Sequence, residues 1–245
     1  MKKTLKIMML TMLTGMLVMS LFSCKSIKFD KDIYSPVAVL TVYSNPSLPW
    51  YDPQAKSSNA VDDSLPGSLL KKANQENPEL YTVQDRIDSA CKTLMEALDE
   101  SGIVTVDADT IFNNAEYQKL SKVFLSNLET DVPASGLKIQ DYMSGTKYRS
   151  LAQSLGAGGM MFVEFSFYKQ KIPSGLHDIF IHARSTMNVY IYDQDGQKVF
   201  HKKYTGVSEK GTVDDNGYYD KHELVAKYPE TVDYVIGCLM QDLLN

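Results

Sequence analysis

The amino-terminal stretch constrains this chain more than any other feature. Lys2, Lys3 and Lys6 precede a run, residues 7–22, that carries no charge. This run is shorter than the roughly 20 apolar residues of a membrane-spanning helix, but it suits the apolar core of an export signal, which needs about 7 to 15. We therefore expect residues 1–23 to be a signal peptide that takes no part in the fold.

The residues around Cys24 resemble the lipobox of bacterial lipoprotein signals. Leu21 lies three residues before Cys24 and the small Ser23 lies just before it, while Phe22 occupies a position where a small residue is usual. The resemblance implies that Cys24 is lipidated on its sulfur and on its new amino group, and several acyl chains give durable membrane anchoring. The alternative is an ordinary secretory signal that leaves Cys24 as a free or paired thiol.

The charge of the chain limits its partners. The sequence has 25 Lys and Arg against 30 Asp and Glu, and removal of the three amino-terminal lysines leaves the mature chain more acidic still. A nucleic-acid-binding protein needs a clustered basic face, so we expect no nucleic acid partner. An acidic body also suits a domain that stays close to an anionic bilayer without lying flat on it.

The mature chain is long enough for one large domain. We expect residues 24–35 to be a tether and residues 36–245 to form a single domain with a proline-rich insertion at about 44–80. This insertion contains the only Trp of the chain. The pair Trp50 and Tyr51 is either an exposed anchor for a partner or a plug that pins the insertion to the core.

Hydrophobic periodicity predicts an α+β fold. Helical spacing of apolar residues predicts helices, and alternation or short apolar runs predict strands, with a hairpin at 194–196. The expected strands are 36–43, 103–106, 160–168, 179–192 and 198–207, and the expected helices are 82–101, 113–128, 146–155 and one that begins at Pro229. This order favours a two-layer sandwich in which helices cover one face of a mixed β-sheet.

Several of these segments resemble a known family. They are SPVAVLTVYSN, ALDESGIVTVD, AQSLGAGGMMFVEFSFY and STMNVYIYDQDGQKVFHKKYTG. They look like periplasmic lipoproteins built on the fold of the amino-terminal domain of the Tol-Pal translocation protein, including the curli-secretion lipoproteins and the lipoprotein activators of penicillin-binding proteins. The chain departs from this pattern in the proline-rich insertion and in the expected helix at about 114–128.

The resemblance implies a lipid-anchored, non-catalytic interaction or assembly module of the cell envelope, with an envelope protein as its partner. Lys25 and Ser26 lack the Asp that retains enteric lipoproteins in the inner membrane, which favours the outer membrane with the domain facing the periplasm. Surface exposure and a homo-oligomeric state are left open.

Motifs for catalysis and metal binding are weak. The four histidines have no paired ligand spacing, and three SxxK matches lack their companion motifs. We therefore expect neither an enzyme nor a cofactor. Asp214, Asn216, Asp220 and Glu223 match positions of a calcium-binding loop, but Thr212 stands where the first carboxylate belongs. A calcium-binding or small-ligand-binding lipoprotein is thus the alternative function, and a polar loop before the last helix is the alternative structure.

The hairpin offers a second candidate surface. Arg184, Tyr190 and Tyr192 share one face of the strand 179–192, and we expect Tyr204 or Phe200 across from them. Exposed aromatic and Arg side chains are typical of protein contact sites, and the alternative is ordinary cross-strand packing under a covering element.

The thiol of Cys91 lies on an apolar helix face, and whether it pairs with Cys238 is left open.

Overall fold

The structure is a computed structural model that describes residues 29–52, 77–120, 131–140, 148–174, 178–213 and 218–245. The helices are α2 Lys31–Tyr34, α4 Pro78–Tyr81, α5 Val83–Glu100, α6 Ala108–Asn113, α7 Ala115–Lys119, α8 Arg149–Leu155, α9 Lys221–Val225 and α10 Tyr228–Leu244. The strands are β1 Val37–Ser44, β2 Val132–Pro133, β3 Gly159–Ser174, β4 Asp178–Asp193, β5 Lys198–Val207 and β6 Thr212–Val213. The expected signal peptide and Cys24 lie outside the described residues.

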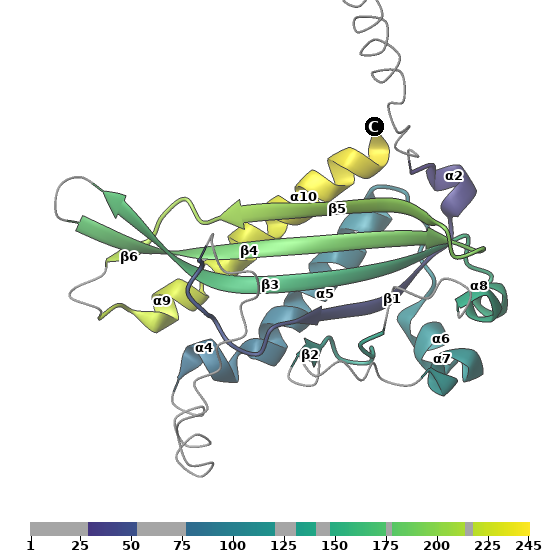
Figure 1. The fold of residues 1–245 in the computed structure, drawn as a ribbon, viewed down its shortest axis with the longest axis horizontal. Helices are drawn as coiled ribbons and strands as arrows, with labels where there is room; N and C mark the ends of the chain where they lie inside the picture. Colours follow the sequence, from purple (N-terminus) through teal and green to yellow (C-terminus); the bar gives the residue numbers. More distant parts are fainter. Residues whose placement is uncertain (1–28, 53–76, 121–130, 141–147, 175–177, 214–217) are drawn as a thin grey trace, which may run out of the picture.

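One mixed sheet organises the described chain (Figure 1). The strand order is β2-β1-β3-β4-β5, and β6 pairs with β4. Strands β1 and β3 are parallel, whereas β3, β4 and β5 are successively antiparallel. The β3–β4 pair keeps its register from Gly159 opposite Asp193 to Ser174 opposite Asp178. It is the longest continuous strand pairing in the described sheet.

The helices α5 and α10 cover one face of this sheet (Figure 1). Along β4 the alternate residues predicted to point inward are fully buried, because each meets the apolar stripe of a helix. Leu94 and Leu98 of α5 and Val235 and Leu239 of α10 complete this core. The predicted α+β sandwich with a mixed sheet is confirmed.

The opposite face is covered at one end by the short helices α6, α7 and α8, which the one-sided layering did not predict (Figure 1). Met160 and Phe162 of β3 are buried there in a second core cluster with Tyr117, Tyr148 and Leu151. The first residues of β3 are apolar on both sides, so they require cover on both sides.

Two predicted elements differ in the structure. Residues 103–106 form only an isolated bridge between Thr105 and Val37, and Val104 is 61% exposed, as an unpaired edge allows. The helix expected at 113–128 begins as α7, which the Asn114 side chain caps, but it ends at Lys119 because Leu120 is extended; residues 121–130 lie outside the described ranges.

The folded part begins before the expected tether ends. Phe29 is buried in the main core, and Lys31–Tyr34 form α2. The helix packs on Gly158, where a Cβ would lie only 2.8 Å from the carbonyl carbon of Tyr34. Within the predicted tether, only residues 24–28 therefore precede the described domain.

The two remaining cysteines are free and half-buried against the main core. Burial, with a smaller contribution from Asp88, raises the pKa of the Cys91 thiol to about 11. Among the described helices, none combines the length and the apolar character that a bilayer-spanning segment needs.

Candidate functional site

The chain after β1 is held along the edge of β3 by side-chain and backbone hydrogen bonds. The Asn45 amide accepts from the backbone N–H of Phe167 at 2.8 Å and donates to its carbonyl at 2.9 Å, so it replaces a strand residue. Pro49 then accepts from the N–H of Lys169, and Tyr51 donates to the Lys169 carbonyl. This pairing fixes residues 49–51 against β3.

Trp50 is an exposed ring on this fixed segment. Its side chain is 44% exposed, while Leu48, two residues earlier, is 3% exposed in the main core. Leu48, and not Trp50, therefore fixes this segment in the core, and the interpretation of Trp50 as an anchor for a partner stays a prediction. The Nζ atoms of Lys169 and Lys171 each lie 5.0 Å from the Trp50 ring centroid, close enough for favourable cation–π contact.

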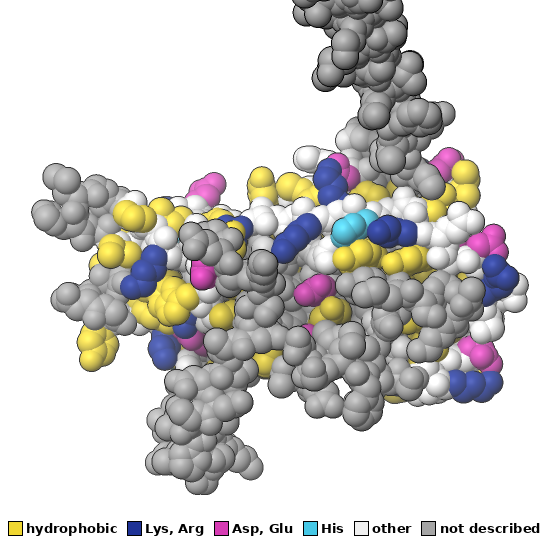
Figure 2. Space-filling model, viewed as in Figure 1, with side chains coloured by type: hydrophobic (Ala, Val, Ile, Leu, Met, Phe, Trp, Pro, Cys, Tyr) yellow, Lys and Arg dark blue, Asp and Glu magenta, His cyan; other side chains and the backbone are white. Residues whose placement is uncertain are grey.

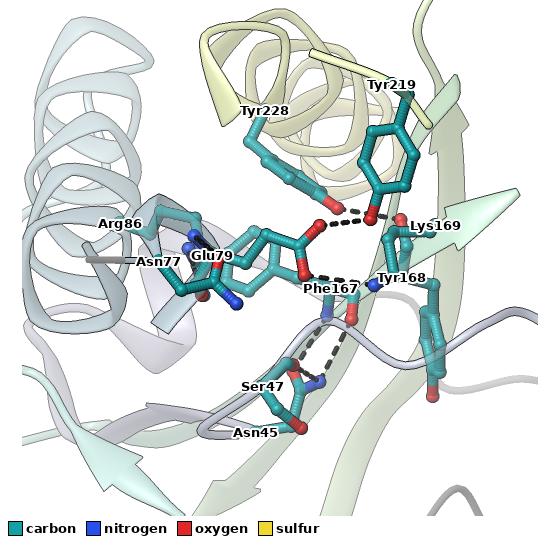
Figure 3. Close-up of polar contacts among 10 residues, drawn as sticks. All are labelled: Asn45, Ser47, Asn77, Glu79, Arg86, Phe167, Tyr168, Lys169, Tyr219 and Tyr228. Atoms are coloured by element: carbon teal, nitrogen blue, oxygen red, sulfur yellow. Dashed lines mark hydrogen bonds and ion pairs between the residues drawn. The ribbon is translucent and has the colours of Figure 1, made fainter. Parts of the chain in front are cut away.

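Lys169, whose ammonium contacts the Trp50 ring, belongs to a buried ion pair (Figure 3). The Lys169 ammonium lies 3.0 Å from Oε2 of Glu79, and the two side chains are 13% and 6% exposed. The Tyr219 hydroxyl donates to the other Glu79 oxygen, and its ring meets Trp50 edge-on at 6.1 Å. Because both carboxylate oxygens are engaged, Glu79 holds the surface in place rather than contacting a ligand.

Arg86 is buried next to Glu79 and is 8% exposed. Its Nη1 donates to the Glu79 carbonyl and to the Thr82 hydroxyl, and its guanidinium lies 5.5 Å and 5.6 Å from the Phe167 and Tyr228 ring centroids. Its Nε and Nη2 have no hydrogen-bond partner. Burial lowers the pKa of Arg86 to about 10, and Tyr228 and Glu79 oppose this shift; at neutral pH the group stays charged.

Tyr51 points to the other face of the sheet. The Arg184 guanidinium carbon lies 3.7 Å from its ring centroid, and Arg184 also donates to Oε1 of Gln170 at 2.9 Å.

A pocket of about 500 Å³ opens between the Trp50 and Tyr51 rings and the edge of β3, and it is lined by Trp50, Tyr51, Gln170 and Lys171. We call it the Trp50 pocket. Figure 2 shows hydrophobic and basic side chains together at this end of the molecule, where α4 and α9 lie in Figure 1.

The structure brings together only part of the predicted partner-binding set. Trp50, Tyr51 and Arg184 meet at the pocket, whereas Tyr190 and Tyr192 lie further along the same face of β4, about 20 Å or more from Arg184. Tyr192 packs edge-on against Phe162, and Tyr190 stacks on His201 at 4.1 Å. These two half-buried tyrosines belong to cross-strand packing and the second core cluster.

Tyr204 lies on the opposite face, which corrects its predicted place beside Tyr190 and Tyr192. It pairs with Met187 across the β4–β5 ladder and is 7% exposed. Its hydroxyl donates to Oδ2 of Asp242 on α10 at 2.7 Å. Burial and this carboxylate raise the pKa of Tyr204, so the residue fastens α10 to the sheet.

The predicted calcium loop is only partly described, because Asp214 and Asn216 lie outside the described ranges. Asp220 caps α9 by accepting from the backbone N–H groups of His222 and Glu223. Glu223 forms an ion pair with Lys227 at 3.0 Å. Both described carboxylates thus have structural roles at the start of the last two helices, and no group of three metal-ligating side chains occurs among the described residues.

The sequence did not single out Glu79, Arg86 or Tyr219 as members of the site. One local signal was available: Asn77 followed by Pro78 is a helix start, and the Asn77 side chain does cap α4. That start places Glu79 in an ordered turn rather than in a loop. The pairing of Glu79 with Lys169 spans 90 residues and has no local pattern.

Comparisons with known proteins find matches among solved structures alone. No protein-family model matches the sequence, and a search of curated proteins finds no match. Among solved structures, the hypothetical protein CT253 from Chlamydia trachomatis matches with a TM-score of 0.35 and 10% identity, over 84% of this chain and 96% of that chain. Lipoprotein GNA1162 from Neisseria meningitidis matches with a TM-score of 0.29 and 11% identity, over 82% of this chain and 99% of that chain. The resemblance to the Tol-Pal domain stays a prediction.

Proposed function

We propose that this chain is a lipid-anchored envelope lipoprotein that binds a protein partner through the Trp50 pocket and has no catalytic activity. The observation that carries the proposal is an exposed Trp fixed on a rigid base. Trp50 is 44% exposed, yet strand pairing and two lysines hold it in one place. Trp, Tyr and Arg are the residues most enriched at the energetic centres of protein interfaces.

Preorganisation favours such a role. An interface pays for every side chain that it orders on binding, about 0.5–1.5 kcal/mol each. Here the ordering is already present, because Glu79, Lys169 and Tyr219 fix the base and Arg184 lies on the Tyr51 ring. A partner would meet two aromatic rings that need no rearrangement.

The position of the pocket also favours a partner beyond the anchoring membrane. The chain enters the fold at α2, which packs against Gly158 and Gly159 at the start of β3, whereas Trp50 pairs with Lys169, about 33 Å further along that strand. In Figure 1 these are opposite ends of the sheet. Residues 24–28 reach about 18 Å at full extension.

The test is in-cell crosslinking of the tagged, lipidated protein, followed by mass spectrometry. The variant is Trp50→Ala, and the matched control is Phe112→Ala, because Phe112 is equally exposed at 44% but lies on α6 at the other end. We expect a reproducible envelope partner that is lost in Trp50→Ala and kept in Phe112→Ala. A partner that both variants keep, or no specific partner, would refute the proposal.

A further inference from the structure

Exposed apolar side chains gather at the end of the domain where the chain enters the fold. Ile33 lies on α2 and is 65% exposed. Val104 is also exposed, and its carbonyl accepts from the N–H of Val37 at the start of β1. Leu244, in the last turn of α10, is 51% exposed. A single exposed apolar residue needs no explanation, but three at one end of a domain indicate a surface that something else covers.

The strand register joins α2 to the starts of β3 and β5. Gly159, on which Tyr34 of α2 packs, begins β3 and pairs with Asp193, the last residue of β4. Strand β5 begins opposite that end of β4. Ile33 therefore lies at the end of the sheet where β3 and β5 begin and β4 ends.

The last turn of α10 lies at this same end. The helix runs antiparallel to β5, because Tyr234 lies beside Gly206 whereas Asp242 forms an ion pair with Lys202 at 2.6 Å, closer to the start of β5. Leu244 follows Asp242 and so comes level with the start of β5. Figure 1 shows the end of α10 and α2 at the same end of the sheet.

The length of the tether brings this end to the membrane. Phe29 is the first described residue and belongs to the main core. The five residues from Cys24 to Phe29 span about 18 Å at full extension. A lipid on Cys24 would therefore hold α2, which begins two residues after Phe29, near the headgroups. Strand β3 alone extends about 50 Å from this end, so the opposite end of the domain can stay clear of the bilayer.

We infer that the end of the domain that carries Ile33, Val104 and Leu244, here called the anchored end, docks on the bilayer that holds the lipid anchor. The inference rests on the proposed function, because it requires a lipid on Cys24, and it adds a second contact that fixes the orientation of the domain. The three side chains lie at the boundary between headgroups and acyl chains, about 5–10 Å deep. The exposed α2 charges stay at the headgroup level.

A bilayer is favoured over a protein at the anchored end because the tether already holds the bilayer at close range. A contact made within a tethered complex benefits from a high effective concentration, so shallow burial of a few side chains is enough to orient the domain. Burial of apolar surface, not charge, drives this contact. End-on docking also turns the Trp50 pocket, about 33 Å along β3, away from the membrane.

The test places a Trp at the anchored end and measures its contact with lipid. The lipidated protein is reconstituted in phosphatidylcholine vesicles whose acyl chains carry bromine near the headgroup, because bromine quenches Trp emission at contact. Ile33→Trp and Leu244→Trp each add one Trp at an exposed position, where a substitution has little effect on folding. We expect the added emission of both variants to be lost in brominated vesicles and kept in unbrominated ones.

Two positions away from the anchored end are the controls. Trp50, the only Trp of the unchanged chain, should keep its emission in brominated vesicles. Tyr234→Trp adds a Trp at a residue that is 61% exposed and lies beside Gly206, about 27 Å along β5 from Lys198. Its added emission should also persist. Equal loss at Tyr234→Trp, or loss from Trp50, would show that the domain lies flat and would overturn the inference.

Failure of this inference is distinguishable from failure of the proposed function. If the protein is recovered with the vesicles on flotation but neither Ile33→Trp nor Leu244→Trp is quenched, only the docking is wrong. If the protein is not recovered with the vesicles, the anchor is absent and both are wrong. If both added Trp residues are quenched but no crosslinked partner depends on Trp50, only the proposed partner binding is wrong.

Discussion

Replacement of Lys169 by Met should destabilise the protein strongly, because it removes the ammonium that pairs with a buried carboxylate. Glu79 is 6% exposed in its side chain and lies 3.0 Å from the Lys169 Nζ. Removing one partner of a buried ion pair leaves an uncompensated charge and typically costs about 3–5 kcal/mol. Tyr219 still donates to Glu79, so we expect the lower end, about 3 kcal/mol. For a chain of this size that corresponds to a fall in melting temperature of about 6–12 °C.

The assay is urea unfolding followed by far-ultraviolet circular dichroism, with the midpoint shift compared at constant slope. The control is Lys171→Met, the same change at an exposed neighbour on the same strand, which should cost less than about 1 kcal/mol because its contacts are at the surface. In the double variant of Lys169→Met with Glu79→Gln, the loss should be smaller than the sum of the two single losses by about 2 kcal/mol. Equal small effects of both lysine changes, or strict additivity in the double variant, would refute the buried-pair account.

Three further predictions concern stability and reactivity. Burial and, to a smaller extent, Glu164 raise the pKa of Asp131 to about 6. Ionisation of Asp131 therefore destabilises the fold above about pH 6, and this penalty disappears toward pH 4. Urea unfolding should show that Asp131→Asn is more stable than the unchanged protein by about 1 kcal/mol at pH 7 and equally stable near pH 4. Gly206→Ala should cost about 1–3 kcal/mol, measured by the same unfolding assay, because its Cβ would lie 2.8 Å from the Thr231 carbonyl oxygen of α10. The Cys91 thiol, with a pKa of about 11 against an ordinary 9.0, should react with maleimide about 100-fold more slowly than in the unfolded chain, as mass spectrometry of timed samples would show; equal rates would contradict its burial.

The sequence predicted the elements whose side-chain pattern is local. Strand β4 was predicted because its inward residues, from Ile181 to Ile191, are apolar or small at every second position. The helices α5 and α10 were predicted because their apolar stripes recur at helical spacing. Such patterns follow from the geometry of each element alone.

The face of Tyr204 could not be predicted in this way. A residue on β5 shares a face with its partner on β4, and the partner depends on the register of the pair. The register joins Tyr204 to Met187, whose side chain is in the main core. Period-two alternation describes each strand but does not align one strand with the next.

The candidate site was predicted only at Trp50, Tyr51 and Arg184. These are residue types that attract attention by themselves, in a proline-rich segment and on an alternating strand. The base of the site depends on contacts between distant segments, such as Glu79 with Lys169 and the Asn45 side chain with Phe167. No spacing in the sequence encodes these contacts, because they arise only when α4 and residues 45–51 pack on β3.

The central claim is that a protein partner contacts Trp50, and photo-crosslinking from that position tests it most directly. A photoreactive phenylalanine analogue is placed at position 50 of the lipidated protein in cells, and in parallel at position 112, which is equally exposed in the structure. The account predicts a discrete adduct with one envelope protein from position 50 and none from position 112. The same adduct from both positions, or no adduct from position 50, would contradict it.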